Sequence, residues 1–169
     1  MRYENYPVWI LLVSNGLSLA IYLVGSLIVV RLGLPWFLIY LAFVLFLEFR
    51  LLNTSCINCY YYGKRCAFGK GKLSCLLFKR GQGIEQFARR ELSWKEIVPD
   101  ILVAFVPIIF GIILLIINFD WILLILVIIV FLLSSIGNGF VRGSLACKYC
   151  KQQEIGCPAA NLFDKKKMI

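Results

Sequence analysis

Six of the seven cysteines in this 169-residue chain fall into two groups with the same spacing, C-x2-C-x6-C. Two residues between cysteines let both sulfurs of a tight turn face one metal ion, while backbone N–H groups of the turn hydrogen-bond to sulfur. Two matching groups therefore predict joint action on a metal or on a redox couple. The candidate metal ligands are Cys56, Cys59, Cys66, Cys147, Cys150 and Cys157.

The seventh cysteine, Cys75, extends only the first group, to C-x2-C-x6-C-x8-C. Four thiols can complete a closed metal site alone, whereas the second group keeps only three. Cys75 also lies in the apolar stretch Leu73–Phe78, where a free thiol behaves as a small hydrophobic side chain. We include Cys75 as a less certain ligand and expect the other six to act as a set.

The chain contains no histidine. This excludes His-ligated haem, His-containing zinc or copper sites, Cys–His dyads and Ser-His-Asp triads. The expected cofactor is an iron–sulfur cluster, with zinc or a single iron ion as alternatives. A single-metal site would draw two thiols from each group, as in ribbon-type sites. No catalytic residue is identified, and whether the chain is an enzyme stays open.

The composition excludes a soluble globular domain, because 61% of the residues are hydrophobic, only 16% are charged and the mean hydropathy is +0.85. Four apolar stretches predict transmembrane helices, at about 7–30, 32–52, 101–117 and 121–141. Only a few residues separate the first from the second and the third from the fourth. We therefore expect an all-α integral membrane protein built from two helical hairpins.

Each cysteine group follows the second span of its predicted hairpin at nearly the same distance. The sequence thus predicts two parallel repeats, 1–75 and 99–169, joined by a linker at 76–98. Parallel repeats begin on the same side of the membrane. The two cysteine groups can then face each other.

All but one of the 18 Lys and Arg residues lie before the first span, in the central loop or after the last span. Basic segments of this kind stay cytoplasmic, so both termini and all cysteines are expected in the cytoplasm. The cytosol keeps thiols reduced, which favours metal ligation over disulfides. The spans carry no charge at their midpoints, which disfavours an ion or proton transporter.

The linker predicts an interfacial amphipathic helix at about 84–97. The net charge of +9 is juxtamembrane, so the expected counterpart is the anionic inner leaflet and not nucleic acid. Tyr60, Tyr61 and Tyr62 are interpreted as ordinary residues of the aromatic belt at the membrane surface.

These observations predict a membrane-anchored metal-binding protein with a cytoplasmic cysteine cap, for iron–sulfur electron transfer or cluster handling with a soluble or membrane redox partner. Two alternatives stay open. One is a thiol–disulfide oxidoreductase in which each C-x2-C is a redox pair. The other is a structural membrane subunit whose loops are fixed by zinc or disulfides. The sequence does not indicate an oligomeric state.

Overall fold

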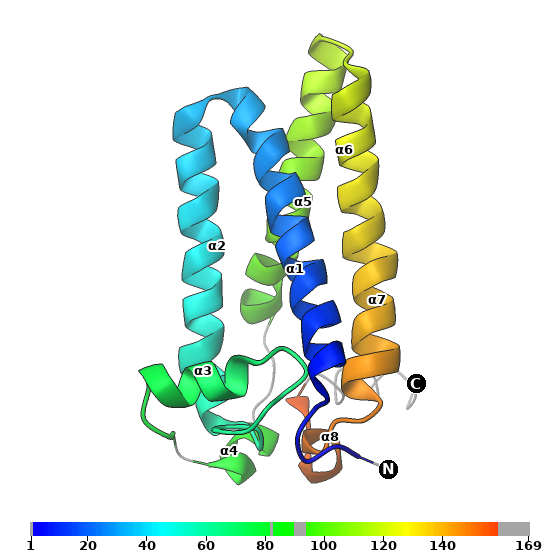
Figure 1. The fold of residues 1–169 in the computed structure, drawn as a ribbon. Helices are drawn as coiled ribbons and strands as arrows, with labels where there is room; N and C mark the ends of the chain where they lie inside the picture. Colours follow the sequence, from blue (N-terminus) through cyan, green and yellow to red (C-terminus); the bar gives the residue numbers. More distant parts are fainter. Residues whose placement is uncertain (1, 82, 90–93, 159–169) are drawn as a thin grey trace.

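The computed structural model describes residues 2–81, 83–89 and 94–158. This part of the chain is helical, and four long helices stand together as a bundle (Figure 1). The predicted all-α chain with four apolar spans is thereby confirmed. The long helices are α1 (Val8–Val29), α2 (Leu34–Thr54), α5 (Trp94–Ile117) and a composite fourth helix that starts with α6 (Trp121–Leu132).

The fourth helix changes its winding on the way to the second cysteine group. After α6 it continues through two π-helical segments, Leu133–Gly137 and Val141–Cys147, with α7 (Asn138–Phe140) between them. The helical segment therefore ends on Cys147 itself, beyond the expected end at residue 141. Short π-helical segments inside longer helices are frequent at functional sites.

Four helices are long and apolar enough to cross a membrane, over Val8–Leu32, Leu34–Asn58, Ile97–Ile117 and Trp121–Cys147. About 20 apolar residues suffice to cover roughly 30 Å of hydrocarbon. Large Leu, Ile and Phe side chains remain exposed along all four helices. Such exposure is expected where lipid takes the place of water, so the structure is consistent with a membrane protein.

Two stretches differ from the expected boundaries. The third long helix begins at Trp94, before the expected start at 101, and continues through Pro99 and Pro107. Of the amphipathic helix expected at 84–97, the structure describes α4 (Ile84–Arg89) and the first turn of α5. Residues 90–93 of that prediction lie outside the described residues.

Close contacts fix how the long helices pack. The hydroxyl of Tyr40 on α2 donates to the carbonyl oxygen of Val103 on α5, at 2.9 Å. A Cβ atom at Gly25 of α1 would lie only 2.6 Å from this hydroxyl oxygen, which is too close for a non-bonded contact. Glycine at this position therefore lets α1 approach the other two helices closely.

One end of the bundle carries the two short turns. Gly33, with a φ of +113°, precedes α2, and Asp120 caps α6 by accepting from the Ile122 N–H at 2.9 Å. An ion pair between Arg31 and Asp120, at 3.5 Å, links the two turns. Figure 1 shows both turns at the same end, away from the short helices.

The other end carries all the cysteines and forms what we call the cysteine cap, residues 2–7, 55–81 and 147–158. It contains a single 3-10 turn, Cys56–Asn58, together with α3 (Lys70–Leu77) and α8 (Gln152–Ile155). Figure 1 shows the N-terminal segment and α8 at this same end. The core of the cap and of the helix ends above it consists of Tyr6, Ile10, Tyr61, Ala67 and Ala146.

Candidate functional site

The two C-x2-C segments adopt the same pair of consecutive turns. In the first, the Cys59 N–H donates to the Cys56 carbonyl at 3.4 Å, and the Tyr62 N–H donates to the Cys59 carbonyl at 3.1 Å. In the second, the matching bonds are Cys150 to Cys147, at 3.1 Å, and Gln153 to Cys150, at 3.3 Å. Both segments therefore have the tight-turn geometry that the spacing predicts.

Backbone N–H groups near the sulfurs oppose the rise in thiol pKa in both segments. The Tyr61 N–H lowers the pKa of Cys59, and the N–H groups of Gln152 and Gln153 lower that of Cys150. Donors of this kind stabilise a thiolate, whether it is free or bound to a metal.

The third cysteine of the first group has a donor from a helix start. The Gly71 N–H, in the first turn of α3, lies 3.4 Å from the sulfur of Cys66. A Cβ at Gly71 would overlap the backbone carbonyl oxygens of Tyr61 and Lys64. Only glycine lets the first turn of α3 approach the cysteine loop this closely.

A reciprocal pair of hydrogen bonds joins the two segments. The Tyr61 hydroxyl accepts from the Lys151 N–H at 3.0 Å, and the Gln152 side-chain oxygen accepts from the Tyr60 N–H at 2.7 Å. Tyr61 and Gln152 each stand two residues after the second cysteine of their segment. Both are buried, with exposed fractions of 2%. The two cysteine groups therefore contact each other through equivalent positions.

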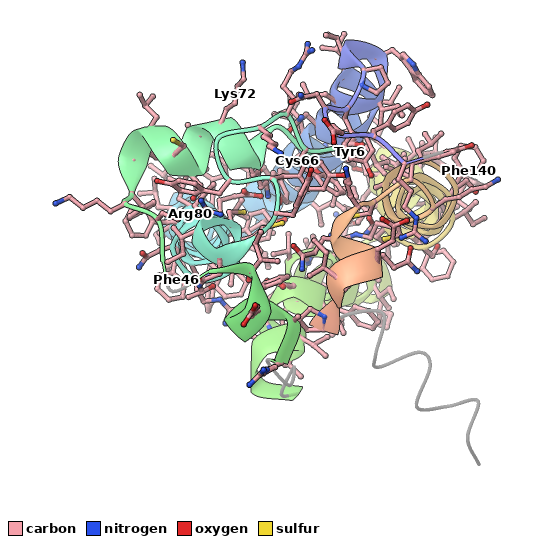
Figure 2. The ribbon with its side chains drawn as sticks, turned by 90° about the horizontal axis from the view of Figure 1, so that it is seen from below. Tyr6, Phe46, Cys66, Lys72, Arg80 and Phe140 are labelled. Carbon is pink, nitrogen blue, oxygen red and sulfur yellow. The ribbon has the colours of Figure 1, made fainter. Side chains whose placement is uncertain are left out.

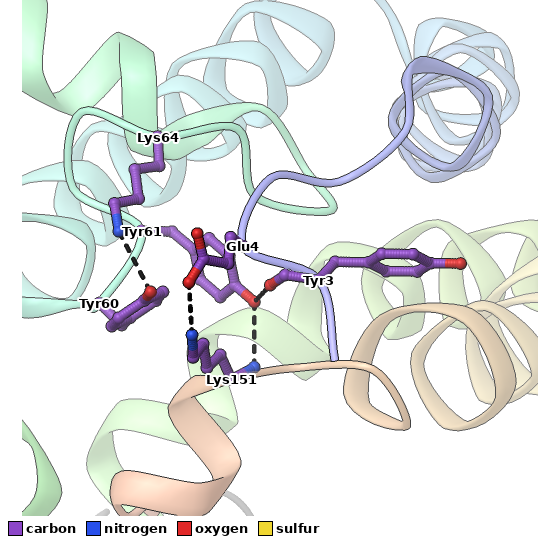
Figure 3. A network of polar contacts seen from close by, with 6 residues as sticks. All are labelled: Tyr3, Glu4, Tyr60, Tyr61, Lys64 and Lys151. Carbon is purple, nitrogen blue, oxygen red and sulfur yellow. Dashed lines mark hydrogen bonds and ion pairs between the residues drawn. The ribbon is translucent and has the colours of Figure 1, made fainter. Parts of the chain in front are cut away.

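The N-terminal segment binds both groups at once. The Tyr3 N–H donates to the Tyr149 carbonyl at 3.1 Å, and the Tyr61 hydroxyl donates to the Tyr3 carbonyl at 2.7 Å. The Tyr6 hydroxyl donates to the Ala146 carbonyl. Figure 3 shows the adjoining ion pair between Glu4 and Lys151, at 2.6 Å.

Five tyrosine rings form a continuous row through the cap. The successive pairs Tyr149–Tyr3, Tyr3–Tyr6, Tyr6–Tyr61 and Tyr61–Tyr60 have centroid distances of 5.2, 5.4, 5.5 and 5.2 Å. Tyr61 is therefore buried inside the protein, and Tyr60 is half-buried against it. Their interpretation as lipid-facing belt residues was wrong for Tyr61, which is 2% exposed.

The pKa of the Cys59 thiol depends on thiols from both cysteine groups. Burial raises its pKa to about 12, against the opposing effect of the Tyr61 N–H. The neighbouring thiols of Cys150, Cys66 and Cys157 raise it further, because a thiolate at Cys59 would be repelled by theirs. Cys59 thus lies within electrostatic range of three of the other candidate ligands, two of them in the second group.

The pKa of Cys150 in the second group is shifted by the same causes. Burial raises the pKa of Cys150, the N–H groups of Gln152 and Gln153 oppose the rise, and the thiols of Cys157 and Cys147 add to it. Together with the turn that joins Cys56 to Cys59, these interactions gather six thiols into one region of the cap. We call them the six-thiol set: Cys56, Cys59, Cys66, Cys147, Cys150 and Cys157.

Cys75 lies apart from this set. The side chain of Cys75 is exposed on α3. It interacts with the Tyr62 hydroxyl, and burial and this interaction both raise the pKa of Tyr62. The Tyr62 hydroxyl also donates to the Phe78 carbonyl at 2.8 Å. Cys75 therefore lies beside Tyr62 and Gly63 of the loop between Cys59 and Cys66, and it is not among the thiols that shift the pKa of Cys59 or Cys150.

All seven cysteines are free thiols, and the sulfurs do not converge as they stand. Across the described ranges, no three Cys, His, Asp or Glu side chains are arranged so that they could hold a metal ion. A metal held by this set would require the thiols to move closer together.

Comparison of the chain with protein-family models, with curated proteins and with solved structures gave no match in any of the three. The chemistry of this site therefore has to be argued from its own residues.

Tyr61 and Gln152 are the site residues that the sequence reasoning did not identify. Their equivalent positions after the two C-x2-C segments were the available signal, since aligning the two groups places them opposite each other. The roles of Tyr3 and Tyr6 carried no comparable signal, because they depend on where the N-terminal segment folds.

Proposed function

We propose that this chain is a membrane-anchored metalloprotein whose cysteine cap binds a thiolate-ligated metal centre between the two cysteine groups. The observation that carries this proposal is the reciprocal pair of hydrogen bonds made by Tyr61 and Gln152, which holds the two C-x2-C turns against each other. Ribbon-type metal sites are likewise built from two C-x2-C turns that face each other.

The donors already present favour thiolate ligands. The Gly71 N–H donates to the sulfur of Cys66, and backbone N–H groups lower the pKa of Cys59 and Cys150, so these donors would stabilise the negative charge that metal binding requires. An iron–sulfur cluster is the centre we favour, because the six-thiol set offers more ligands than one tetrahedral ion needs. Zinc or a single iron, held by two cysteines from each group, is the alternative.

We further propose that the two halves, 1–75 and 99–169, are parallel repeats and that the cap faces the cytoplasm. The matching turns and the equivalent positions of Tyr61 and Gln152 support the repeat. The distribution of Lys and Arg supports the orientation. A cytoplasmic centre of this kind would serve electron transfer or cluster handling with a redox partner.

Metal ligation fits the site better than thiol–disulfide exchange. An exchange thiol needs a substantial thiolate fraction near neutral pH. Burial instead raises the pKa of both Cys59 and Cys150. A metal cation removes this obstacle, since it replaces the proton and neutralises the charge.

The test is metal analysis and visible absorption of the full-length protein, purified in detergent without oxygen. We expect bound iron and sulfide with charge-transfer absorption in the visible region. Colourless protein with stoichiometric zinc would favour a structural metal site and overturn the electron-transfer role. Colourless, metal-free protein that does not take up iron and sulfide on reconstitution would overturn the proposal altogether.

A further inference from the structure

Helix α3 lies across the base of α2, at the edge of the bundle (Figure 1). Its inner side is fixed by three contacts. The Ser74 hydroxyl donates to the Leu52 carbonyl at 3.1 Å, and the ring of Phe78 packs against that of Phe49, at 5.1 Å between centroids. Lys70, the first residue of α3, pairs with Glu48 at 2.6 Å. These contacts therefore hold α3 across the C-terminal end of α2 (Figure 1).

The outer side of α3 is divided into an apolar and a polar arc. At 100° per residue, Leu73, Leu76 and Leu77 occupy one continuous arc, with exposed fractions of 46%, 82% and 55%. Lys72 and Cys75 occupy the adjoining arc and are also exposed. Figure 2 shows the Lys72 side chain pointing away from the bundle.

The apolar arc continues a lipid-facing surface. Phe46 and Phe49 on the last turns of α2 are 62% and 55% exposed, and Phe49 is the ring on which Phe78 packs. The polar arc and the segment after the helix carry the exposed cations Lys72 and Lys79. A short helix with leucines toward the hydrocarbon and lysines toward the headgroups has the pattern of an interfacial anchor.

We propose that α3 is a lipid-binding helix that inserts Leu73, Leu76 and Leu77 into the boundary between headgroups and acyl chains, with Lys72 and Lys79 against anionic phospholipid headgroups. This surface is distinct from the linker helix at 84–97 that the sequence indicated. It depends on the membrane-spanning arrangement and not on the identity of any metal.

The position of α3 also bears on the cysteine cap. The Gly71 N–H that faces Cys66 belongs to the first turn of α3, and Gly71 itself packs against the Tyr61 backbone. A helix anchored in the leaflet would therefore hold the third cysteine of the first group in place. This consequence, unlike the lipid contact itself, rests on the proposed function.

The test uses the full-length protein in lipid nanodiscs and a photo-cross-linking residue, benzoylphenylalanine, placed at Leu76. The control carries the same residue at Gln153, an exposed position on α8 of the cysteine cap that is not part of the proposed lipid-binding surface. After illumination, mass spectrometry identifies what each position has bound. One set of nanodiscs contains phosphatidylcholine alone and the other contains phosphatidylglycerol as well.

We expect a phospholipid adduct at position 76, many-fold weaker at position 153, and enriched in phosphatidylglycerol where that lipid is present. The same experiment at Leu73, on the same arc, guards against a local defect of the first variant. Equal adducts at 153 and 76, no lipid adduct at 73 and 76, or adducts to a second protein chain would overturn the proposal. Loss of the preference for phosphatidylglycerol would overturn its anionic part.

The cross-linking result and the metal result can be separated. The metal content of the same samples is measured before illumination. A lipid adduct in metal-free protein would leave the lipid-binding helix standing while the proposed function fails. Bound metal without a lipid adduct would do the reverse.

Discussion

Tyr61 and Gln152 each accept a hydrogen bond from the backbone N–H of the residue that precedes the other. The two distances are 3.0 Å from the Lys151 nitrogen to the Tyr61 hydroxyl and 2.7 Å from the Tyr60 nitrogen to the Gln152 oxygen. Gln152 also donates to the Gly156 carbonyl at 2.8 Å, so its amide is engaged at both ends. This exchange is the main direct link between the two C-x2-C turns.

Replacing Tyr61 by Phe should weaken the cap and its metal centre. The change leaves the Lys151 N–H and the Tyr3 carbonyl without their partner, at a cost of about 1–3 kcal/mol for each buried group. We expect a lower unfolding temperature in detergent and reduced metal content. Tyr62→Phe is the matched control, because that hydroxyl donates to Phe78 inside the same loop. Equal metal loss in both variants would contradict the role of Tyr61.

Serine substitution should separate the six-thiol set from Cys75. Changing any of the six is expected to release the metal and loosen the cap, because metal binding contributes to its folding. Cys75→Ser should retain metal, since that thiol is exposed on α3. The measurement is metal content per protein. Loss of about half the metal in Cys75→Ser would instead mean that each half binds separately, with four thiols in the first.

The expected orientation can be tested with a membrane-impermeant maleimide. Cys75 and Cys147 are the exposed thiols of the cap. Cys75 should react in inverted vesicles and remain unlabelled in intact cells, and Cys147 should do the same once metal is removed, because basic segments of this kind are expected to stay cytoplasmic. Labelling is read by mass spectrometry of the peptides. Reaction from outside intact cells would place the cap in an oxidising compartment and remove the argument against disulfides.

The metal-free protein should lose stability as the pH rises above about 9. The Cys59 thiol has an ordinary pKa of 9.0, and burial raises it to about 12 in the folded chain. Its contribution to stability is fully present below pH 9 and is lost as the pH rises toward 12, because the unfolded chain releases this proton first. One such group gives a slope of about 1.4 kcal/mol per pH unit in that window.

Thermal unfolding of the metal-free protein between pH 7 and 11 measures this slope. Cys59→Ser is the control, since it removes the titrating group. An unchanged slope in that variant would assign the pH dependence to other thiols or tyrosines.

Replacing Gly71 by Ala should disrupt the cap. The added Cβ would overlap the carbonyl oxygens of Tyr61 and Lys64, and overpacking of this kind typically costs about 1–3 kcal/mol. Gly143→Ala is the control, because nothing lies within 4 Å of a Cβ there. That variant should be neutral or more stable by about 0.5–1 kcal/mol, as for alanine in a helix. Equal unfolding temperatures for the two variants would contradict the close approach of α3.

The all-helical fold with four apolar spans and the local form of the cysteine turns both follow from the amino-acid sequence. Uncharged stretches of membrane-crossing length have one stable solution in lipid, because every backbone polar group must be bonded within the segment. The helices α1 and α2 therefore fall close to the predicted 7–30 and 32–52. The C-x2-C spacing likewise sets a tight turn, since its hydrogen bonds join residues three apart.

Helix boundaries next to the cap depended on more than hydropathy. The fourth helix continues through polar residues to Cys147, and α5 begins before Pro99. At both positions the helix continues because of backbone hydrogen bonds and packing, which the length of an uncharged apolar stretch does not measure.

Only the tertiary structure decided what surrounds the cysteines. The Tyr61 and Gln152 bonds join residues 90 and 92 positions apart, and the row of tyrosines includes Tyr3 and Tyr149 from opposite ends of the chain. Such contacts have no local pattern, because they arise when the helices bring distant segments to the same end of the bundle. The burial that raises the pKa of Cys59, and the separation of Cys75 from the six-thiol set, follow from that same assembly.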